Sequence, residues 1–489
     1  MSFLQRTHPT CRDARSRVSP VCLFFILAMS AANAQAEQLH IVVGGPHFRP
    51  YPVAVPAATA RGATSEPATG LTEFLRVGTD LIRPLELVPP QTYLAPGKDA
   101  FQPAFADWSN IGASGLIRAE VATAASHQLH ITMRFFDVVT QQEVVTETCV
   151  AIPPGEVAVD TPANTSRNHM VGLRRCAYGF LDKVVEKLTG EKGILSSEIA
   201  YVKRTDAGKA VFVCDVDGRN PRRITKTDAL SLLPAWAPSG HHLLFTSYRE
   251  NNPDLWRVDL RTRNMEWLSK RKGLNTGAAV SPDGQRIALT LSLDGNTEIY
   301  LMGWHGKNLR RLTDSWGQDV SPTWSPDGQR IAFVSSRSGN PHIYVMNADG
   351  SSPRRLTFQG TYNQEPDWSP RNDGQIVFTA RDERLKYDIF LVHPTTGEIT
   401  RLTQDEGDNE SPSFSPDGHH IVFTSTRGSS REKKLFIMNV DGTRQRRISH
   451  GPGNYETPAW GPRLATSGTT GVPQPISDLE RADAESRGD

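Results

Sequence analysis

Apolar and polar positions in the second half of the chain repeat with a period of 44 to 46 residues. In each repeat, an apolar residue is followed two positions later by a proline, which usually lies in a polar Ser-Pro-Asp-Gly sequence. The prolines that mark the repeats are Pro238, Pro282, Pro326, Pro370, Pro416 and Pro462. A period in the forties is typical of both helical solenoids and β-propellers.

The contents of one repeat, residues 321–357, distinguish between these two architectures. Its apolar residues fall in short runs rich in β-branched and aromatic side chains, separated by turn sequences. We assign its strands to residues 322–324, 331–335, 343–346 and 354–357. The repeat lacks the 3.6-residue periodicity of an amphipathic helix. The pattern therefore predicts a four-stranded antiparallel blade, and the series of repeats predicts a β-propeller.

The two ends of the repeat region indicate how many blades to expect. Residues 199–225 contain counterparts of the second, third and fourth strands, without an inner strand. Residues 458–460 contain an inner strand alone. Since these two pieces complete each other, we expect six blades, one of them built from both ends of the region. Such a blade closes the ring and leaves no open strand edge.

The first half of the chain lacks the repeat and mixes helical and strand patterns. We expect helices at 72–82 and 169–188, a C-terminal cap at Gly190, and a hairpin of strands 129–137 and 143–149. The expected fold is therefore an α+β N-terminal domain followed by an all-β six-bladed propeller. The domain boundaries are placed at 37–195 for the first and 196–462 for the second, with a disordered polar tail at 463–489.

The N-terminus has the three-part pattern of a secretory signal peptide. Arg6, Arg12, Arg15 and Arg17 precede an apolar run at 21–32, and Ala32-Asn33-Ala34 follows as a cleavage sequence. A membrane anchor is the alternative, which is less favoured because the apolar run is short. We therefore expect residues 1–36 to be removed and the protein to be periplasmic. The remaining chain has 50 basic and 52 acidic residues, which gives no basic field for nucleic acid.

Three cysteines remain after such cleavage: Cys149, Cys176 and Cys214. An odd number allows at most one internal disulfide in an oxidising compartment. The pair Cys149–Cys176 is favoured, although the sequence alone does not decide it. None of the three has the spacing of a metal site.

Several recurring polar residues have simple structural explanations. Residues 215–220 begin like a Ca²⁺ loop, but they lack its twelfth-position glutamate and align with hairpin turns in other repeats. Asp283, Asp327 and Asp417 are likewise expected in turns. We expect the arginine pairs of the outer strands to protect sheet edges rather than to form an anion site. The histidine pairs 241–242 and 419–420 are expected to be solvated.

Catalytic signatures are missing from the sequence, which has no Gly-x-Ser-x-Gly elbow and no P-loop. We therefore expect a binding protein with no cofactor and no metal, and not an enzyme. The remaining alternative is a propeller-borne lyase or glycosidase with its site in the central channel.

The loops that enter the inner strands of a propeller surround one mouth of its channel. In this chain those loops differ between repeats and are rich in amides and carboxylates, which suits recognition of a protein partner. The candidate partner-binding residues at this mouth are Leu232, Leu233, Asn275, Thr276, Asp319, Val320, Asn363, Gln364, Glu365, Asn409, Glu410, Tyr455 and Glu456.

Two sets of residues carry a family resemblance: 186–190, 192–193 and 199–202 around the start of the propeller, and 40–43 and 52–56 near the N-terminus. The first set is similar to the link between the two domains of the TolB family of the Tol–Pal envelope system, and the second resembles that family's N-terminal stretch. The chain departs from the family at 57–69, in its three cysteines and in the tail after Pro462.

This resemblance implies two protein partners. The propeller would bind the peptidoglycan-associated lipoprotein Pal, and the N-terminal segment His40, Ile41, Val42 and Val43 would contact the inner-membrane protein TolA. The implied role is a scaffold that links the inner-membrane Tol components to Pal, for outer-membrane integrity and invagination during cell division. The chain would act as a monomer.

Overall fold

The computed structural model describes residues 48–62, 65–93, 103–123, 128–151, 162–205, 208–225, 229–372, 374–428 and 432–464, with the backbone alone at 162–168. The expected signal peptide, the segment His40–Val43 and the tail after residue 464 lie outside the described residues. Within the described ranges, none of the helices is long and apolar enough to cross a membrane.

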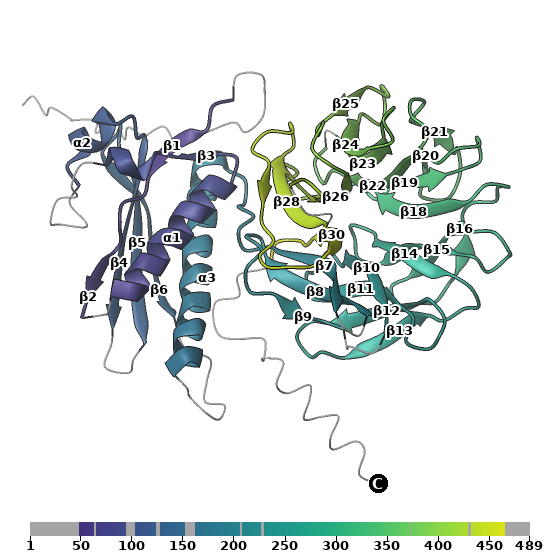
Figure 1. Cartoon of the computed structure of the whole chain (residues 1–489), viewed down its shortest axis with the longest axis horizontal. Coiled ribbons are helices and arrows are strands. Elements are labelled where there is room, and N and C mark those ends of the chain that lie inside the picture. Colours follow the sequence, from purple (N-terminus) through teal and green to yellow (C-terminus); the bar gives the residue numbers. More distant parts are fainter. Residues whose placement is uncertain are drawn as a thin grey trace, which may run out of the picture. The chain divides into compact units, whose positions relative to one another are not determined.

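The N-terminal domain is a mixed sheet with helices (Figure 1). Its elements are β1 (Tyr51–Ala54), β2 (Thr59–Arg61), α1 (Ser65–Leu81), β3 (Leu85–Leu87), the 3₁₀ helix Pro90–Thr92, α2 (Phe105–Asn110), β4 (Gly115–Thr123), β5 (Leu129–Asp137), β6 (Gln142–Ala151) and α3 (Pro162–Thr189). The sheet order is β3-β1-β4-β5-β6, with β2 paired to β4. The expected hairpin is confirmed as β5 and β6. In the turn between them, Gln141 has a left-handed backbone conformation (φ 57°).

Helices α1 and α3 lie side by side along the sheet (Figure 1). Phe74 of α1, Phe180 of α3 and Phe135 of β5 share one buried core, because each helix presents an apolar stripe. Helix α1 begins at Ser65 rather than at the predicted residue 72. Pro67 lies in its first turn, where a missing N–H costs no helical hydrogen bond.

The long helix α3 ends as the sequence predicts, but it begins at Pro162 rather than at residue 169. Gly190 follows it with φ 74° and donates its N–H to the carbonyl of Glu186 (2.9 Å). Cys176 of this helix forms a disulfide with Cys149 of β6, which confirms the favoured pair. The third cysteine, Cys214, is free and buried in the propeller.

The propeller consists, in the described residues, of six four-stranded sheets arranged as a ring (Figure 1). The strands of blades 1 to 3 are β10 (Ser231–Trp236), β11 (His242–Ser247), β12 (Asp254–Asp259), β13 (Met265–Ser269), β14 (Asn275–Val280), β15 (Arg286–Leu291), β16 (Glu298–Gly303), β17 (Arg310–Arg311), β18 (Asp319–Trp324), β19 (Arg330–Ser335), β20 (His342–Asn347) and β21 (Arg354–Arg355). Those of blades 4 and 5 are β22 (Asn363–Trp368), β23 (Ile376–Arg381), β24 (Tyr387–Val392), β25 (Ile399–Arg401), β26 (Asn409–Phe414), β27 (His420–Ser425), β28 (Lys434–Asn439) and β29 (Arg446–Arg447).

The sixth blade is composite, which confirms the prediction from the repeat ends. Its inner strand β30 (Tyr455–Trp460) pairs with β7 (Glu198–Thr205), which continues into β8 (Gly208–Asp215) and β9 (Arg222–Arg223). We call the junction between this blade and blade 1 the seam. At the seam, Trp236 Nε1 donates to the carbonyl of Ala459 (3.0 Å), as Trp324 donates to Ala279 between blades 3 and 2 (3.1 Å). The aromatic residue of the inner strand thus joins each of these blades to the preceding one.

The acidic turn residues behave as the sequence predicts. Asp283 and Asp327 each accept hydrogen bonds from a nearby backbone N–H and from a serine hydroxyl. Residues 215–220 form a hairpin turn in which Asp215 N–H donates to the carbonyl of Arg219 (3.0 Å). No group of three or more potential metal ligands occurs in the part of the chain that the structure describes.

The arginine pairs lie on the outermost strands, as expected. The last arginine of each of these outer strands donates from Nε to the carbonyl two residues further along; the donors and acceptors are Arg223–Thr225, Arg311–Thr313, Arg355–Thr357, Arg401–Thr403 and Arg447–Ser449. These bonds secure the chain where it leaves the blade toward the next inner strand.

Candidate functional site

The inner strands line the central channel, and each contains a bulge at its third residue. The six third residues all have positive φ: Leu233, Gly277, Ser321, Glu365, Ser411 and Thr457. The strand pairing shifts at this point in every blade. A left-handed conformation of a residue other than glycine costs about 1 to 3 kcal/mol, so its recurrence marks a feature that the fold maintains.

The first residues of the inner strands are buried between neighbouring blades. Asp319 Oδ2 accepts a bond from Arg337 Nη2 (2.6 Å), Asn363 Nδ2 lies 2.9 Å from His342 Nδ1, and Asn409 Nδ2 donates to Asp388 (3.0 Å). Asn275 and Tyr455 are buried in the same way. These five side chains of the predicted mouth are therefore buried and do not face solvent, and Asn363 and Asn409 contact residues of the preceding blade.

The second residues of the inner strands are half-buried. They are Leu232, Thr276, Val320, Gln364, Glu410 and Glu456. Two of them, Leu232 and Val320, also pack against apolar clusters. Glu410 pairs with Lys433 (2.9 Å), and Glu456 pairs with Lys209. These side chains are the predicted mouth residues that a partner could contact, together with the third residues.

Among the described residues, no lysine or arginine pairs with Glu365, unlike Asp319, Glu410 and Glu456 of the other inner strands. Its carboxylate accepts bonds from Ser411 N–H (2.8 Å), Ser411 Oγ (3.0 Å) and Thr379 Oγ1 (3.0 Å). Burial raises the pKa of Glu365, and the nearby charge of Glu410 raises it further. The residue thus joins blades 4 and 5 inside the channel.

The loops at this end of the blades carry exposed apolar side chains. The inner strand begins where the second strand ends, so the loops before the first strand and after the second strand share one face, which we call the loop face. Its large exposed apolar residues are Leu233, Tyr248, Leu274, Leu293, Trp316, Phe358 and Leu385. Trp316, Phe358 and Leu385 are 77%, 72% and 65% exposed. All seven belong to blades 1 to 4 or to the loops that enter them.

These exposed apolar residues were missed by the sequence analysis, apart from Leu233. A signal was available, because Phe358 directly follows the Leu-Thr after its outer strand and Trp316 lies three residues after the equivalent Leu-Thr, in loops that are otherwise mostly polar. Clustered exposed apolar side chains are typical of protein-interaction surfaces, whereas isolated ones are not informative.

The opposite ends of the blades contact the N-terminal domain and the link that follows it. Arg371 contacts both Glu191 (3.2 Å) and His419 (2.8 Å), and His420 accepts a bond from the backbone N–H of Arg83 (3.0 Å). His419 and His420 are therefore buried, and the expectation that they are solvated is wrong. The error arose because one partner of each histidine is remote in the sequence: Glu191 is 228 residues from His419, and Arg83 is 337 residues from His420.

The same contact region holds a buried carboxylate. Burial alone would raise the pKa of Asp417, but the charges and hydrogen bonds of His420 and His419 bring it well below its usual range. Burial lowers the pKa of His419. This polar network lies at the end of the ring that contacts the N-terminal domain. In the described residues, the loop face at the other end has no contacts with that domain.

Comparison with known proteins identifies the family of this fold. A family model described as the TolB beta propeller domain matches residues 185–464, and a model of the TolB amino-terminal domain matches residues 39–144. The chain belongs to the TolB family. The first match covers more than half of the chain and spans the whole propeller.

Named relatives agree with this assignment to the TolB family. The chain is 39% identical over 233 residues to the Tol-Pal system protein TolB of Anaeromyxobacter dehalogenans, which is 47% of this chain and 50% of that protein. It is 35% identical over 242 residues to the protein of the same name from Desulfosudis oleivorans, or 48% and 51% of the two chains. The aligned region thus spans about half the length of the curated relatives.

A solved structure extends the likeness to both domains. The crystal structure of TolB from Acinetobacter baumannii matches with a TM-score of 0.70 and 26% identity. The match covers 85% of this chain and 97% of that one. The α+β domain and the six-bladed propeller are therefore shared with a TolB of known structure.

Proposed function

We propose that this chain is a periplasmic binding scaffold of the Tol–Pal system and that its loop face binds a Pal-type domain. The observation that carries the proposal is the set of exposed apolar residues on the loop face of a TolB-family propeller. Association buries apolar area, and large aromatic side chains supply most of the binding energy in many protein interfaces.

The details of the loop face support a partner footprint over blades 1 to 4. Trp316 and Phe358 provide two large exposed anchors in the loops that enter blades 3 and 4. The half-buried Gln364 and the channel residue Glu365 lie at the start of the inner strand of blade 4 and offer polar contacts. This combination of apolar anchors with a polar surround is the usual composition of a protein interface.

The N-terminal segment His40–Val43 would engage a TolA-type inner-membrane protein in the same proposal. The two sites would connect the inner-membrane Tol components with Pal, which would support outer-membrane integrity and invagination during division. Binding rather than catalysis is the proposed activity, and neither a cofactor nor a metal takes part.

Replacing both Trp316 and Phe358 by alanine is expected to weaken binding of a Pal-type domain by about tenfold or more, because both anchors are lost. Binding is measured by calorimetric titration of the chain from Glu37 onward. The control is Val139→Ala, which removes an equally exposed apolar side chain from the N-terminal domain. Equal affinity of the unmodified chain, the double variant and the control would mean that the site does not include these loops. Absence of binding by the unmodified chain would refute the proposal.

A further inference from the structure

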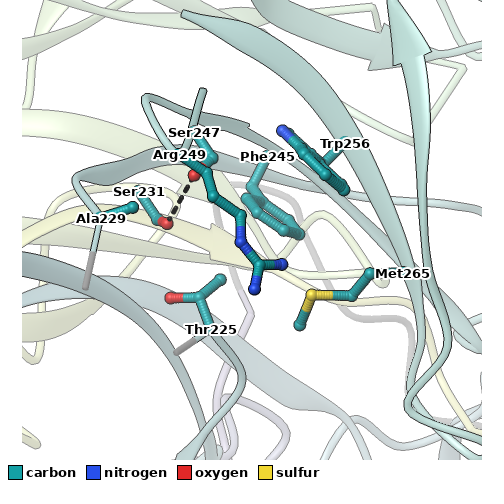
Figure 2. A pocket seen from close by; sticks show the side chains of 8 residues that line it. All are labelled: Thr225, Ala229, Ser231, Phe245, Ser247, Arg249, Trp256 and Met265. Atoms are coloured by element: carbon teal, nitrogen blue, oxygen red, sulfur yellow. Dashed lines mark hydrogen bonds between the residues drawn. The ribbon is translucent and has the colours of Figure 1, made fainter. Parts of the chain in front are cut away.

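One pocket of the propeller lies at the seam. Its lining residues can be compared with the residues at the same positions of the other blade junctions. Thr225, Ala229, Ser231, Phe245, Ser247, Arg249, Trp256 and Met265 line it, around about 290 Å³ of space open to solvent. Figure 2 shows the side chain of Arg249 extending into this space among Thr225, Phe245 and Met265. The pocket opens at the end of the blades that also bears the loop face.

The junction between blades 2 and 3 contains carboxylates where the seam has small residues. There, Arg337 donates to Asp319 (2.6 Å), and the hydroxyl of Thr313 donates to Glu298 (2.6 Å). The first carboxylate belongs to the first residue of the inner strand, and the second belongs to the residue before Ile299, whose N–H donates to Thr313 Oγ1 (2.9 Å).

The junction between blades 4 and 5 repeats this arrangement. The hydroxyl of Thr403 donates to Asp388 (2.7 Å), Asn409 also donates to Asp388 (3.0 Å), and Arg427 donates to Asn409 Oδ1 (2.9 Å). An arginine and a threonine thus hold a carboxylate or amide at both junctions.

The seam keeps the arginine and the threonine, but the described residues at the corresponding positions do not supply the groups that they bind. Ser231 occupies the position of Asp319, because it is the first residue of β10 and pairs with Ser247 as Asp319 pairs with Ser335. Ala210 occupies the position of Glu298, because the N–H of the next residue, Val211, donates to Thr225 Oγ1 (3.0 Å). Neither Ser231 nor Ala210 can supply a carboxylate.

Arg249 is consequently without the carboxylate or amide that its counterparts Arg337 and Arg427 bind. Arg249, two residues after Ser247, is exposed and makes no ion pair with any described residue, and its guanidinium lies 5.9 Å from the centre of the Trp256 ring. The indole Nε1 of Trp256 is itself buried without a hydrogen-bond partner in the described part of the chain. Phe245, Trp256 and Met265 add an apolar wall beside these donors.

We propose that the seam pocket binds a small aliphatic carboxylate, whose charged group takes the place that Asp319 and Glu298 fill between blades 2 and 3. The guanidinium of Arg249 and the hydroxyl of Thr225 bind the carboxylate, and the short alkyl chain packs on Phe245 and Met265. Charge-assisted hydrogen bonds from arginine are about twice as strong as neutral ones, so the carboxylate provides most of the recognition.

The test measures butyrate binding to the whole chain by ligand-observed NMR. We expect saturable binding with a dissociation constant on the order of 1 mM, and about tenfold or greater weakening in Arg249→Gln. Butyramide, which has the same length without the charge, is expected to bind at least about tenfold more weakly than butyrate. The matched control is Arg261→Gln, which removes an exposed arginine at the other end of the same blade and should leave binding unchanged.

A second variant supplies the missing group from the chain itself. Ser231→Asp restores the residue found at the equivalent position of blade 3, and its carboxylate should pair with Arg249 and abolish butyrate binding. The proposal is overturned if butyrate shows no saturable contact up to roughly 30 mM. It is also overturned if Arg249→Gln binds as well as Arg261→Gln, because the pocket would then play no part.

Discussion

Replacing Trp460 by alanine is expected to lower the free energy of unfolding by about 3 to 5 kcal/mol, the cost of removing a large buried aromatic side chain. Trp460 is 7% exposed and is the last residue of β30, the strand that completes blade 6. Its indole Nε1 donates to Ser197 Oγ (2.8 Å), at the start of the first propeller strand. Its backbone N–H donates to Ser413 Oγ (3.1 Å) in blade 5. One side chain thus holds the composite blade at the point where the ring closes.

The measurement is urea denaturation followed by circular dichroism, with the midpoint and slope compared between proteins. The control is Trp316→Ala, which removes the same side chain from an exposed loop and should change the stability by less than about 0.5 kcal/mol. If both variants unfold at the midpoint of the unmodified chain, ring closure does not depend on packing around Trp460.

The stability of the protein is expected to fall by about 3 kcal/mol between pH 6.5 and pH 4 through His342 alone. The imidazole is 3% exposed and lies between blades 3 and 4, with Nε2 2.7 Å from Arg355 Nη2 and Nδ1 2.9 Å from Asn363 Nδ2. Burial and the charge of Arg355 lower the pKa of His342 from 6.5 to about 4. The unfolded chain therefore binds a proton across this range while the folded chain does not, and the stabilisation present above pH 6.5 is lost as the pH falls toward 4.

The variant His342→Glu tests this source of pH dependence. In blade 2 the equivalent Glu298 pairs with Arg311 (2.9 Å), so a glutamate at position 342 can pair with Arg355. The variant should gain stability relative to the unmodified chain as the pH is lowered from 6.5, measured by urea denaturation at each pH. The exposed His305 provides the control, and His305→Gln should follow the unmodified chain. Parallel curves for all three proteins would assign the acid sensitivity to other groups.

The blade junctions connect these predictions with the proposed ligand site. Three junctions have a buried polar group near the start of the third strand, and the group differs from blade to blade: Glu298, His342 and Asp388 occupy the position in blades 2, 3 and 4. A carboxylate there is ion-paired, and the histidine is held neutral beside an arginine. Ala210 occupies the same position in blade 6 and has no polar side chain, which is why the pocket forms at the seam.

The sequence by itself determined the architecture of this protein. The repeat of an inner-strand aromatic, a second strand such as Ile331–Phe333 and an Asp-Gly turn predicted the blades, because strand and turn preferences act over a few residues. The incomplete pieces at 199–225 and 458–460 predicted the composite blade, which β30 and β7 confirm. The disulfide partner of Cys149 was favoured but not fixed by sequence, and the fold decided it by bringing β6 against α3.

Only the tertiary structure decided which side chains are available for binding. Asp319 and Asn409 have the composition of a polar mouth, yet both are buried: Arg337 of the same blade binds Asp319, and Asn409 binds Asp388 of the preceding blade. His419 is buried by Glu191, which is 228 residues away in the chain. Trp316 is an apolar residue that remains exposed on the loop face. Burial depends on contacts between segments that are distant in the sequence. A local sequence pattern contains no information on these contacts, which form only when the chain folds.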